Sequence, residues 1–495
     1  MGIGLFLAAM DQTIVVAGTS YASIGSELEQ LQRTTWIATA YMLTVTSFQP
    51  LYGKLCNIFG RKPVLLCAYG IFALGSLCCG LARTMDELIF SRALAGVGGG
   101  GMTTIVSIIL SDIVPLRLRG KWQGYVNIIY TCGSISGAPI GGVVADSIGW
   151  RWAFLIQTLP CLGAMLVVAF YLDLPGAQDH SSFLSKIKRI DYLGSITLIA
   201  SILSLLVAFD HGGNISWSDS VTLISIGTLF LSLSLFIIVE NYLASEPIAS
   251  MNIIFNKSFL GAYLSNFFGV SVMMTVFFYA PIYLQAVKQQ SASMTSLWLV
   301  FTVLAGLSGS LGSGFIMQAT GKFYAISVIS YTMLIGGAAC LLLSTGVFSH
   351  SAAGVAVGLT LVSLGNVGPF FNKGAGTTST LIALVSNAGH ENQAMATATS
   401  YLFRSLGSVL GVAFGNNIEQ QVLRTTLRNL LDVENIDEII RRSRESLSYI
   451  NTLEPVLQEK VRNGYSVAVQ AIMTVGYGIN SVQKIIALRI SFMDM

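Results

Sequence analysis

The stretch Gly53-Lys-Leu-Cys-Asn57-Ile-Phe-Gly60-Arg61-Lys62 joins two long apolar segments of the chain. Glycine has no side chain and therefore permits the tight reversal that such a short connection needs. Lys and Arg gather in the cytosolic connections of membrane proteins, so Arg61 and Lys62 place this turn at the cytosolic face. The stretch therefore predicts two membrane helices joined by a cytosolic turn.

The composition agrees with a membrane protein. Of 495 residues, 53% are hydrophobic and 10% are charged, whereas a soluble domain carries about 25% charged residues. A soluble globular enzyme is thereby excluded. The net charge of +3 is too small to indicate nucleic-acid binding. The cysteines and histidines lack metal-site spacing, and there is no phosphate-binding loop for ATP. We expect no metal, no cofactor and no enzymatic activity.

Apolar runs long enough to cross a bilayer recur along the whole chain. They predict about fourteen helices near residues 2–24, 34–54, 63–82, 87–110, 121–145, 152–172, 191–209, 220–240, 258–283, 297–317, 323–344, 353–371, 394–418 and 465–489. The last is a poor membrane helix because it contains Gln470, Asn480, Lys484 and Arg489.

The distribution of positive charge orients these helices. Connections after even-numbered helices hold most of the Lys and Arg residues, so they and the N-terminus are predicted to be cytosolic. The mixed-charge segment 419–464 is then a loop outside the cytosol or in a lumen. Asn214, in the sequon Asn214-Ile-Ser216, is a lumenal glycosylation candidate.

Two glycine patterns occur twice in the chain. Gly53 and Gly60-Arg61 are echoed by Gly314 and Gly321-Lys322. The triplet Gly133, Gly137 and Gly141 is echoed by Gly407, Gly411 and Gly415. These echoes predict a six-helix half over 1–175, two inserted helices over 176–257 and a second six-helix half over 258–495. In such duplicated bundles the substrate site lies near the midplane of the membrane.

Asp11 lies roughly halfway along the first apolar segment. A charge at that depth costs about 2.5–3.5 kcal/mol even on the lenient insertion scale. A proton-binding or cation-binding role would explain why it is kept. The alternative is an acid that pairs with a neighbouring helix purely to fix packing.

The fifth predicted helix contains Gly133-Ser-Ile-Ser-Gly137-Ala-Pro139-Ile-Gly141-Gly142. Glycines four residues apart form one smooth face that allows close helix contact. Pro139 adds a kink or a pivot. Tight packing alone would explain the pattern.

These motifs resemble those of the major facilitator superfamily. The stretch 53–62 is similar to its signature loop G-x-L-x-D-x-x-G-R-K, except that Asn57 replaces the acid. Asn57 can cap a helix but cannot supply the charge of the electrostatic latch ascribed to that acid. The stretch 133–142 looks like the G-x-P-x-G-G motif of the superfamily's antiporters.

Two arginines extend the resemblance. Arg92 resembles the family's fourth-helix arginine, which is assigned a part in proton transfer, although its side chain could instead extend to the membrane interface. Arg404 is too deep in its helix to reach the interface, and Asp11 is its candidate partner. We expect Asp11, Arg92 and Arg404 to couple proton and substrate.

The segment Phe6–Val16 is similar to the first helix of the fourteen-span drug:proton antiporter family. Ser111–Gly120 and Ser134–Trp152 most resemble fungal vacuolar basic amino acid transporters. The resemblance implies a monomer in the vacuolar membrane that exchanges protons for lysine, arginine or histidine. One alternative is a multidrug:proton antiporter at the plasma membrane. Another is a nutrient sensor that keeps the fold and no longer transports.

Overall fold

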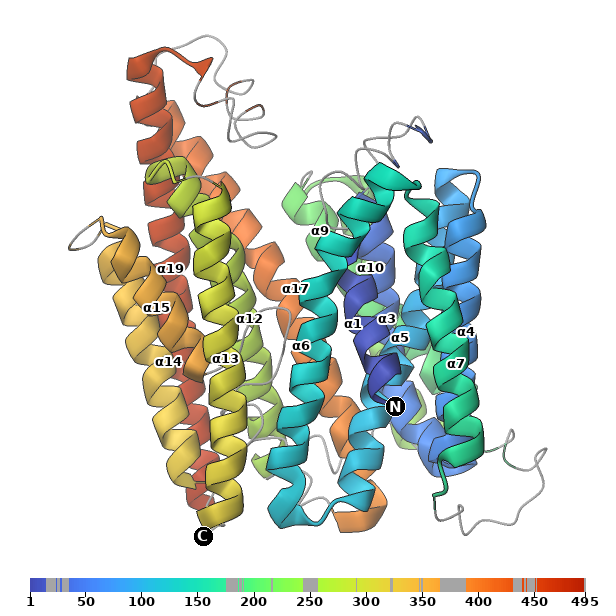
Figure 1. Cartoon of the computed structure of the whole chain (residues 1–495). Coiled ribbons are helices and arrows are strands. Elements are labelled where there is room, and N and C mark those ends of the chain that lie inside the picture. The colour runs from blue at the N-terminus through green and yellow to red at the C-terminus, as the bar shows by residue number, and fades with distance from the viewer. Residues whose placement is uncertain are drawn as a thin grey trace. The chain divides into compact units, whose positions relative to one another are not determined.

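The computed structural model is shown in Figure 1. It describes residues 1–14, 35–174, 191–214, 217–243, 257–290, 292–320, 324–346, 350–365, 389–430 and 452–493, with isolated positions such as Glu27 between them. The regular secondary structure of these ranges is helical. The expected all-α fold is therefore confirmed.

The chain divides into two compact units. Unit 1 comprises residues 1–208, 223–260 and 381–403, and unit 2 comprises residues 209–222, 261–380 and 404–495. Unit 1 contains α1 (Gly2–Ile14), α3 (Thr35–Phe59), α4 (Arg61–Leu81), α5 (Met85–Ile113), α6 (Leu116–Ser147) and α7 (Arg151–Tyr171), with most of α9 (Tyr192–Asn214) and of α10 (Ser220–Ile238), and the π-helical turn η2 (Val239–Leu243).

Unit 2 contains the helices of the second predicted half. They are α12 (Lys257–Ile282), which ends in the π-helical turn η3 (Tyr283–Val287), α13 (Ala292–Thr320), α14 (Tyr324–Ser344), α15 (Ala352–Gly365) and α19 (Pro455–Met493). The long helix α17 (Gly389–Leu430) contributes its first part to unit 1 and the rest to unit 2. Each of the fourteen predicted helices has a counterpart. Positions 15–23, 366–371, Gly321 and Lys322 lie outside the described residues.

Glycines of α5 let this helix pack between α3 and α4. A Cβ atom added at Gly100 would stand 2.8 Å from the backbone oxygen of Val45 on α3. One added at Gly98 would stand 2.7 Å from the backbone oxygen of Ala68 on α4. Such distances are too short for any larger residue. The run of glycines at 96–101 is therefore a helix-packing surface in the middle of unit 1.

The start of α5 follows from a local sequence signal. Thr84 is the N-cap, and its side chain accepts a hydrogen bond from the backbone N–H of Glu87 at 3.2 Å. The Glu87 carboxylate in turn accepts from the backbone N–H of Arg83 at 2.8 Å. These bonds satisfy backbone donors that the first helical turn leaves open. They fix the point at which the chain enters α5.

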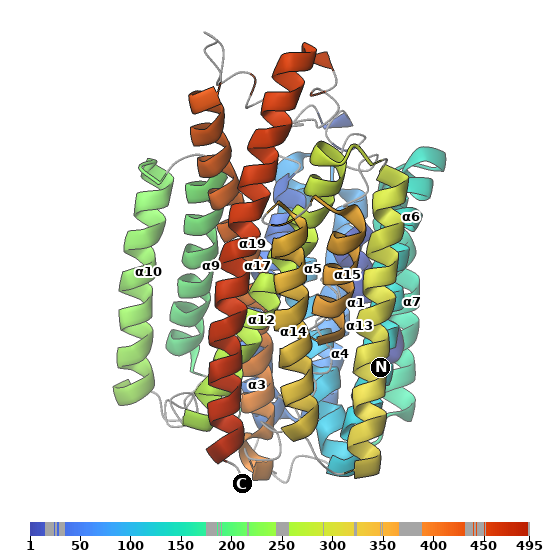
Figure 2. The same ribbon diagram turned by 90° about the vertical axis from the view of Figure 1, so that its left-hand side faces the viewer.

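The segment 419–464, predicted to be a loop, is helical at both ends. α17 continues to Leu430 and α19 begins at Pro455, so helices cover both ends of the segment. Leu423 and Leu427 of α17 pack with Val461 and Tyr465 of α19 in one buried apolar cluster. A four-residue spacing puts such residues on one helix face, and the charged residues between them lower the average hydropathy. Figure 2 shows α19 as one long helix beside α14.

Seven helical stretches of the described residues are long and apolar enough to cross a membrane. They are Arg61–Leu81, Met85–Ile113, Lys121–Ala145, Arg151–Tyr171, Tyr192–Phe209, Ser220–Leu243 and Phe259–Val287. Shorter apolar helical stretches lie at Gly2–Ile14, Trp298–Gly309, Thr332–Ser344 and Ala352–Gly365.

Candidate functional site

Asp11 lies on α1, which packs closely along the glycine face of α6. A Cβ atom added at any of three α6 glycines would overlap a backbone oxygen of α1, and the pairs are Gly133 with Phe6, Gly137 with Met10, and Gly141 with Ile14. A larger side chain would push the helices apart. The glycine motif therefore sets the position of α1, and with it that of Asp11. Pro139 lies on the exposed side of α6.

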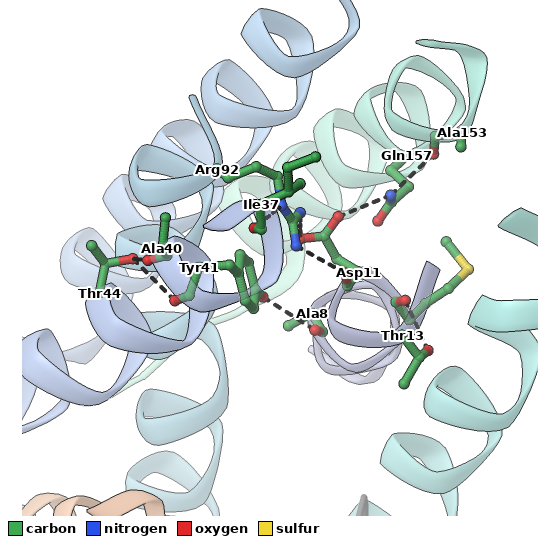
Figure 3. A network of polar contacts seen from close by, with 11 residues as sticks. Ala8, Asp11, Thr13, Ile37, Ala40, Tyr41, Thr44, Arg92, Ala153 and Gln157 are labelled. Carbon is green, nitrogen blue, oxygen red and sulfur yellow. Dashed lines mark hydrogen bonds and ion pairs between the residues drawn. The ribbon is translucent and has the colours of Figure 1, made fainter. Parts of the chain in front are cut away.

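The Asp11 carboxylate forms an ion pair with Arg92 of α5 (Figure 3). Nη1 of Arg92 lies 2.5 Å from Oδ2 of Asp11, and Nη2 donates to the backbone oxygen of the same residue at 3.2 Å. Nε of Arg92 donates to the backbone oxygen of Ile37 on α3 at 3.2 Å. The exposed fractions of the Asp11 and Arg92 side chains are 0% and 1%. The pair therefore ties α1, α3 and α5 together inside unit 1.

Gln157 of α7 holds the other carboxylate oxygen. Its Nε2 donates to Oδ1 of Asp11 at 3.1 Å and to the backbone oxygen of Ala153 at 3.0 Å (Figure 3). Both carboxylate oxygens of Asp11 therefore have a hydrogen-bond donor. Gln157 was not among the residues predicted from the sequence. Its sequence signal is an amide side chain inside an apolar segment, because a buried amide needs a hydrogen-bond partner.

Two aromatic rings cover the Arg92 guanidinium. Its Cζ lies 4.4 Å from the ring centroid of Tyr41 and 5.4 Å from that of Phe154. The face of an aromatic ring attracts a cation, most strongly where water is excluded. The Tyr41 hydroxyl also donates to the backbone oxygen of Ala8 on α1 at 3.2 Å. The ion pair thus lies in an aromatic enclosure built by α3 and α7.

Several contacts of this arrangement depend on the charge of one carboxyl group. When one member of a buried ion pair loses its charge, the other charge stays buried without compensation, which typically costs about 3–5 kcal/mol. Protonation of Asp11 would leave Arg92 in that position. The contacts of Asp11, Arg92, Ile37 and Gln157 join four helices, so the packing of these helices depends on the charge of one carboxyl group.

The structure decides two points that the sequence left open for the arginines. Arg92 does not extend to the membrane interface, which was the alternative, because its guanidinium is buried and paired. The cation that pairs with Asp11 is Arg92, whereas the candidate named from the sequence was Arg404. Arg404 lies on the part of α17 that belongs to unit 2, and its side chain is 1% exposed. Its burial agrees with its predicted depth.

The signature stretch contains a turn of a single residue between two helices. α3 ends at Phe59 and α4 begins at Arg61, with Gly60 between them at φ 89°. Side chains strongly disfavour this conformation, so the position requires glycine. Gly60 is also the N-cap of α4. Asn57, which could have capped a helix, does not cap α4, because it lies in the last turn of α3.

The negative charge beside the signature turn is that of Asp112 on α5. Nε of Arg61 lies 2.9 Å from Oδ2 of Asp112. Nε2 of Gln393, in the first turns of α17, donates to the other carboxylate oxygen at 3.2 Å. Gly53 lets this part of α17 approach α3, since a Cβ atom added there would stand 2.6 Å from Cβ of Ala398. Asp112 thus links the signature turn to α17. Lys62 lies beside this cluster in the first turn of α4.

A second polar cluster gathers around Glu27, which is itself exposed. Its carboxylate accepts from Nε1 of Trp150 at 2.7 Å and from Nη1 of Arg151. The Arg151 guanidinium lies 4.3 Å from the centroid of the Trp150 ring, and its Nη2 donates to the backbone oxygen of Ala82 at 3.2 Å. The hydrogen bond from Arg151 is the main reason that the pKa of Glu27 is lowered.

Asn214, the glycosylation candidate, is the last residue of α9.

Unit 2 repeats the helix contact that positions Asp11. Two glycines of α17 approach backbone oxygens of α12 as the α6 glycines approach those of α1, and the pairs are Gly407 with Phe267 and Gly411 with Ser271. The third glycine, Gly415, faces the ring of Tyr279 and the methyl group of Thr275. Phe267, Ser271 and Thr275 follow Phe6, Met10 and Ile14 at one constant offset along the chain. The predicted glycine echo is therefore a repeated structural contact.

The same offset places Val272 at the position of Asp11. Val272 is 2% exposed and belongs to an apolar cluster with Val276, Leu334 and Leu359. The repeated helix pair is therefore packed in unit 2 with an apolar residue at this point. Unit 1 thus holds a buried acid where unit 2 holds an apolar side chain.

The chain is similar in sequence to known proteins. A model of the Major Facilitator Superfamily matches residues 1–412. The chain is 38% identical to a Schizosaccharomyces pombe protein named vacuolar membrane amino acid uptake transporter fnx2, over 93% of the chain and 78% of the relative. It is 33% identical to vacuolar basic amino acid transporter 2 of Saccharomyces cerevisiae, over 88% and 92%. It is 37% identical to the S. pombe multidrug resistance protein fnx1, over 94% and 86%.

A solved structure with the same fold is the crystal structure of the human organic anion transporter MFSD10. It superposes with a TM-score of 0.61 at 13% sequence identity, covering 98% of this chain and 97% of that one. The family match covers unit 1, unit 2 as far as residue 412, and every helix that carries the Asp11 site. This chain is an integral membrane protein and belongs to the major facilitator superfamily of transporters.

Proposed function

We propose that this protein is a proton-coupled antiporter that moves basic amino acids from the cytosol into the vacuole. The similarity to two relatives named as vacuolar amino acid transporters supports this substrate class and membrane. The observation that carries the proposal is the buried pair of Asp11 and Arg92, at a point where unit 2 holds Val272.

The proton-dependent step follows from the contacts of Asp11. In its ionised form the carboxylate holds Arg92 and Gln157, and the helices are packed as described. A proton arriving from the acidic lumen neutralises the carboxylate and weakens its hold on Arg92. The buried charge of Arg92 then has no opposite charge beside it. The conformation in which Asp11 and Arg92 are paired therefore loses its free-energy advantage over a conformation in which they are separated. Loss of the proton to the cytosol restores the pair.

Arg92 thereby acts as a resident cation for Asp11. A substrate cation and a proton each change the electrostatic balance at the same group, so the two are exchanged rather than carried together. The close α1–α6 contact transmits the change, because a shift of α1 moves the whole glycine face of α6. Arg404, equally buried on α17, is assigned to the same coupling on the side of unit 2.

The test is uptake by the purified full chain in lipid vesicles. With an acidic interior and a neutral exterior, we expect labelled lysine, arginine and histidine to accumulate inside. A protonophore that removes the gradient should abolish the accumulation. Uptake that is independent of the pH gradient would contradict proton coupling, and absence of all uptake would favour a sensor.

A multidrug:proton antiporter is the second candidate. Its support is the 37% identity to fnx1, which is named a multidrug resistance protein. The same vesicles discriminate the two, since lysine should compete with labelled arginine whereas a hydrophobic cation should not. The opposite pattern of competition would favour the drug transporter.

A further inference from the structure

One amide side chain on α1 is not buried like its neighbours. From Leu7 to Ile14 every residue of α1 is buried except Gln12, which is partly exposed. Gln12 lies roughly halfway along the first predicted membrane segment. A polar group that faced lipid at this depth would lose its hydrogen bonds to water. An exposed amide is accommodated here because this side of α1 faces water rather than lipid.

Tyr130 of α6 holds the Gln12 side chain in place. Its hydroxyl donates to Oε1 of Gln12 at 2.8 Å. Its ring packs against a buried apolar cluster of Leu5, Val106 and Val126, so the hydroxyl has a fixed position. Tyr130 is itself partly exposed. The amide is therefore oriented before a ligand arrives, which lowers the entropy cost of binding.

The contact with Tyr130 leaves the donor end of the amide open. Among the described residues, none accepts a hydrogen bond from Nε2 of Gln12. Nε2 carries two N–H groups, and these bind only an acceptor. The lysine ammonium and the arginine guanidinium offer donors alone. The α-carboxylate, which lysine, arginine and histidine share, is the acceptor that fits this position.

The ion pair of Asp11 and Arg92 does not offer a site of this kind. Its side chains are 0% and 1% exposed, so a substrate cannot reach them in this conformation. Gln12 is the next residue along α1 and projects about 100° from Asp11 around the helix axis. A ligand on Gln12 and a proton on Asp11 therefore act on the same turn of α1.

The internal repeat sets Gln12 apart from its counterpart in unit 2. The offset between α1 and α12 places Met273 at the position of Gln12, and Met273 is 1% exposed within an apolar cluster. The offset between α6 and α17 places Arg404 at the position of Tyr130. The partly exposed amide is thus a feature of unit 1 that the corresponding point of unit 2 does not share.

We propose that Gln12 binds the α-carboxylate of the transported amino acid and that Tyr130 positions it, an inference that rests on the proposed function. The carboxylate accepts from Nε2 of Gln12, while Oε1 keeps its hydrogen bond from Tyr130. This contact is common to lysine, arginine and histidine and does not select among their side chains. A hydrophobic drug cation without a carboxylate gains nothing from it.

Gln12→Glu separates substrate binding from helix packing. Glutamate still accepts from the Tyr130 hydroxyl, but it offers no donor and adds a negative charge. In lysine exchange at equal pH, we expect Gln12→Glu to raise the KM for lysine about tenfold, which corresponds to about 1.4 kcal/mol. Tyr130→Phe should raise the KM less, because the amide keeps its donor and loses only its orientation.

The matched control is Ser136→Ala on the same helix as Tyr130. Ser136 is also partly exposed, and its hydroxyl donates within α6 to the backbone oxygen of Gly133 at 2.8 Å. Ser136→Ala should leave the KM for lysine unchanged. If Gln12→Glu does not reach the membrane, Gln12→Met, which is uncharged and of similar size, takes its place with the same expected rise in KM.

Cadaverine, which is lysine without its carboxylate, gives a second readout. In wild-type protein it should inhibit arginine uptake more weakly than lysine does, and Gln12→Glu should remove this preference. An unchanged preference, or an unchanged KM for lysine, would overturn the carboxylate contact. Wild-type vesicles that take up no amino acid would instead refute the proposed function itself.

Discussion

Arg92 contacts Asp11 twice, through Nη1 to the carboxylate and through Nη2 to the backbone oxygen of the same residue. The second contact does not depend on charge. Protonation of the carboxyl group therefore weakens the link between α5 and α1 without removing it. In the proposed cycle, this second contact keeps α1 in register with α5 while the carboxyl group is protonated.

The first prediction concerns stability. Arg92→Ala leaves the Asp11 charge buried without its partner and should destabilise the protein by about 3–5 kcal/mol. The double variant Arg92→Ala with Asp11→Asn has no charge to compensate and should recover much of that loss. Thermal unfolding in detergent measures both. Equal melting temperatures for the single and double variants would contradict a stabilising ion pair.

The second prediction concerns the glycine face of α6. A side chain at Gly137 would overlap the Met10 backbone oxygen and the Thr13 hydroxyl, so Gly137→Leu should displace α1 and strongly reduce uptake. Gly163→Leu on α7 is the matched control, because an added Cβ there meets nothing within 4 Å. Transport by the two variants at equal membrane abundance measures the difference. Similar activities would show that the close α1–α6 contact is dispensable.

The third prediction concerns pH. Because Arg151 lowers the pKa of Glu27 in the folded protein, this interaction stabilises the fold above the ordinary glutamate pKa. The stabilisation is lost as the pH falls through the lowered pKa. Glu27→Gln should therefore reduce the melting temperature at neutral pH, and the difference from wild type should vanish in strong acid. A difference that is constant with pH would contradict the assignment.

The fourth prediction concerns Asp112. Gln393→Glu places a second carboxylate where an amide now donates to Asp112 at 3.2 Å, so the start of α17 should separate from α5. Hydrogen exchange at the backbone amides of 389–403 should then accelerate. Gln393→Met, which is uncharged and of similar size, is the control and should change exchange less. Identical exchange in both variants would exclude a repulsive effect.

Much of the fold could be predicted from the sequence, because a membrane helix requires a long apolar run whatever its neighbours are. The segment 419–464 shows where this fails. Leu423 and Leu427 are buried, but Arg424 and two threonines between them lower the hydropathy average. The helical arrangement therefore continues into a region that composition alone assigns to a loop.

The candidate site was predicted in part. Asp11 and Arg92 are conspicuous as charges in apolar segments, whereas their pairing depends on how α1 and α5 meet in three dimensions. Gln157, Tyr41 and Phe154 are ordinary residues in their own helices, and contact with the ion pair is what distinguishes them. Asn57 was identified as a departure from the motif, but the ion pair of Arg61 with Asp112 could be found only from the structure.

The most direct test of the central claim is lysine transport by Asp11→Asn in vesicles, measured in two modes. Uptake driven by an acidic interior should be lost, because asparagine cannot bind and release the proton. Exchange of internal for external lysine at equal pH should persist and show that the variant is folded. Full proton-driven uptake by Asp11→Asn would contradict the account.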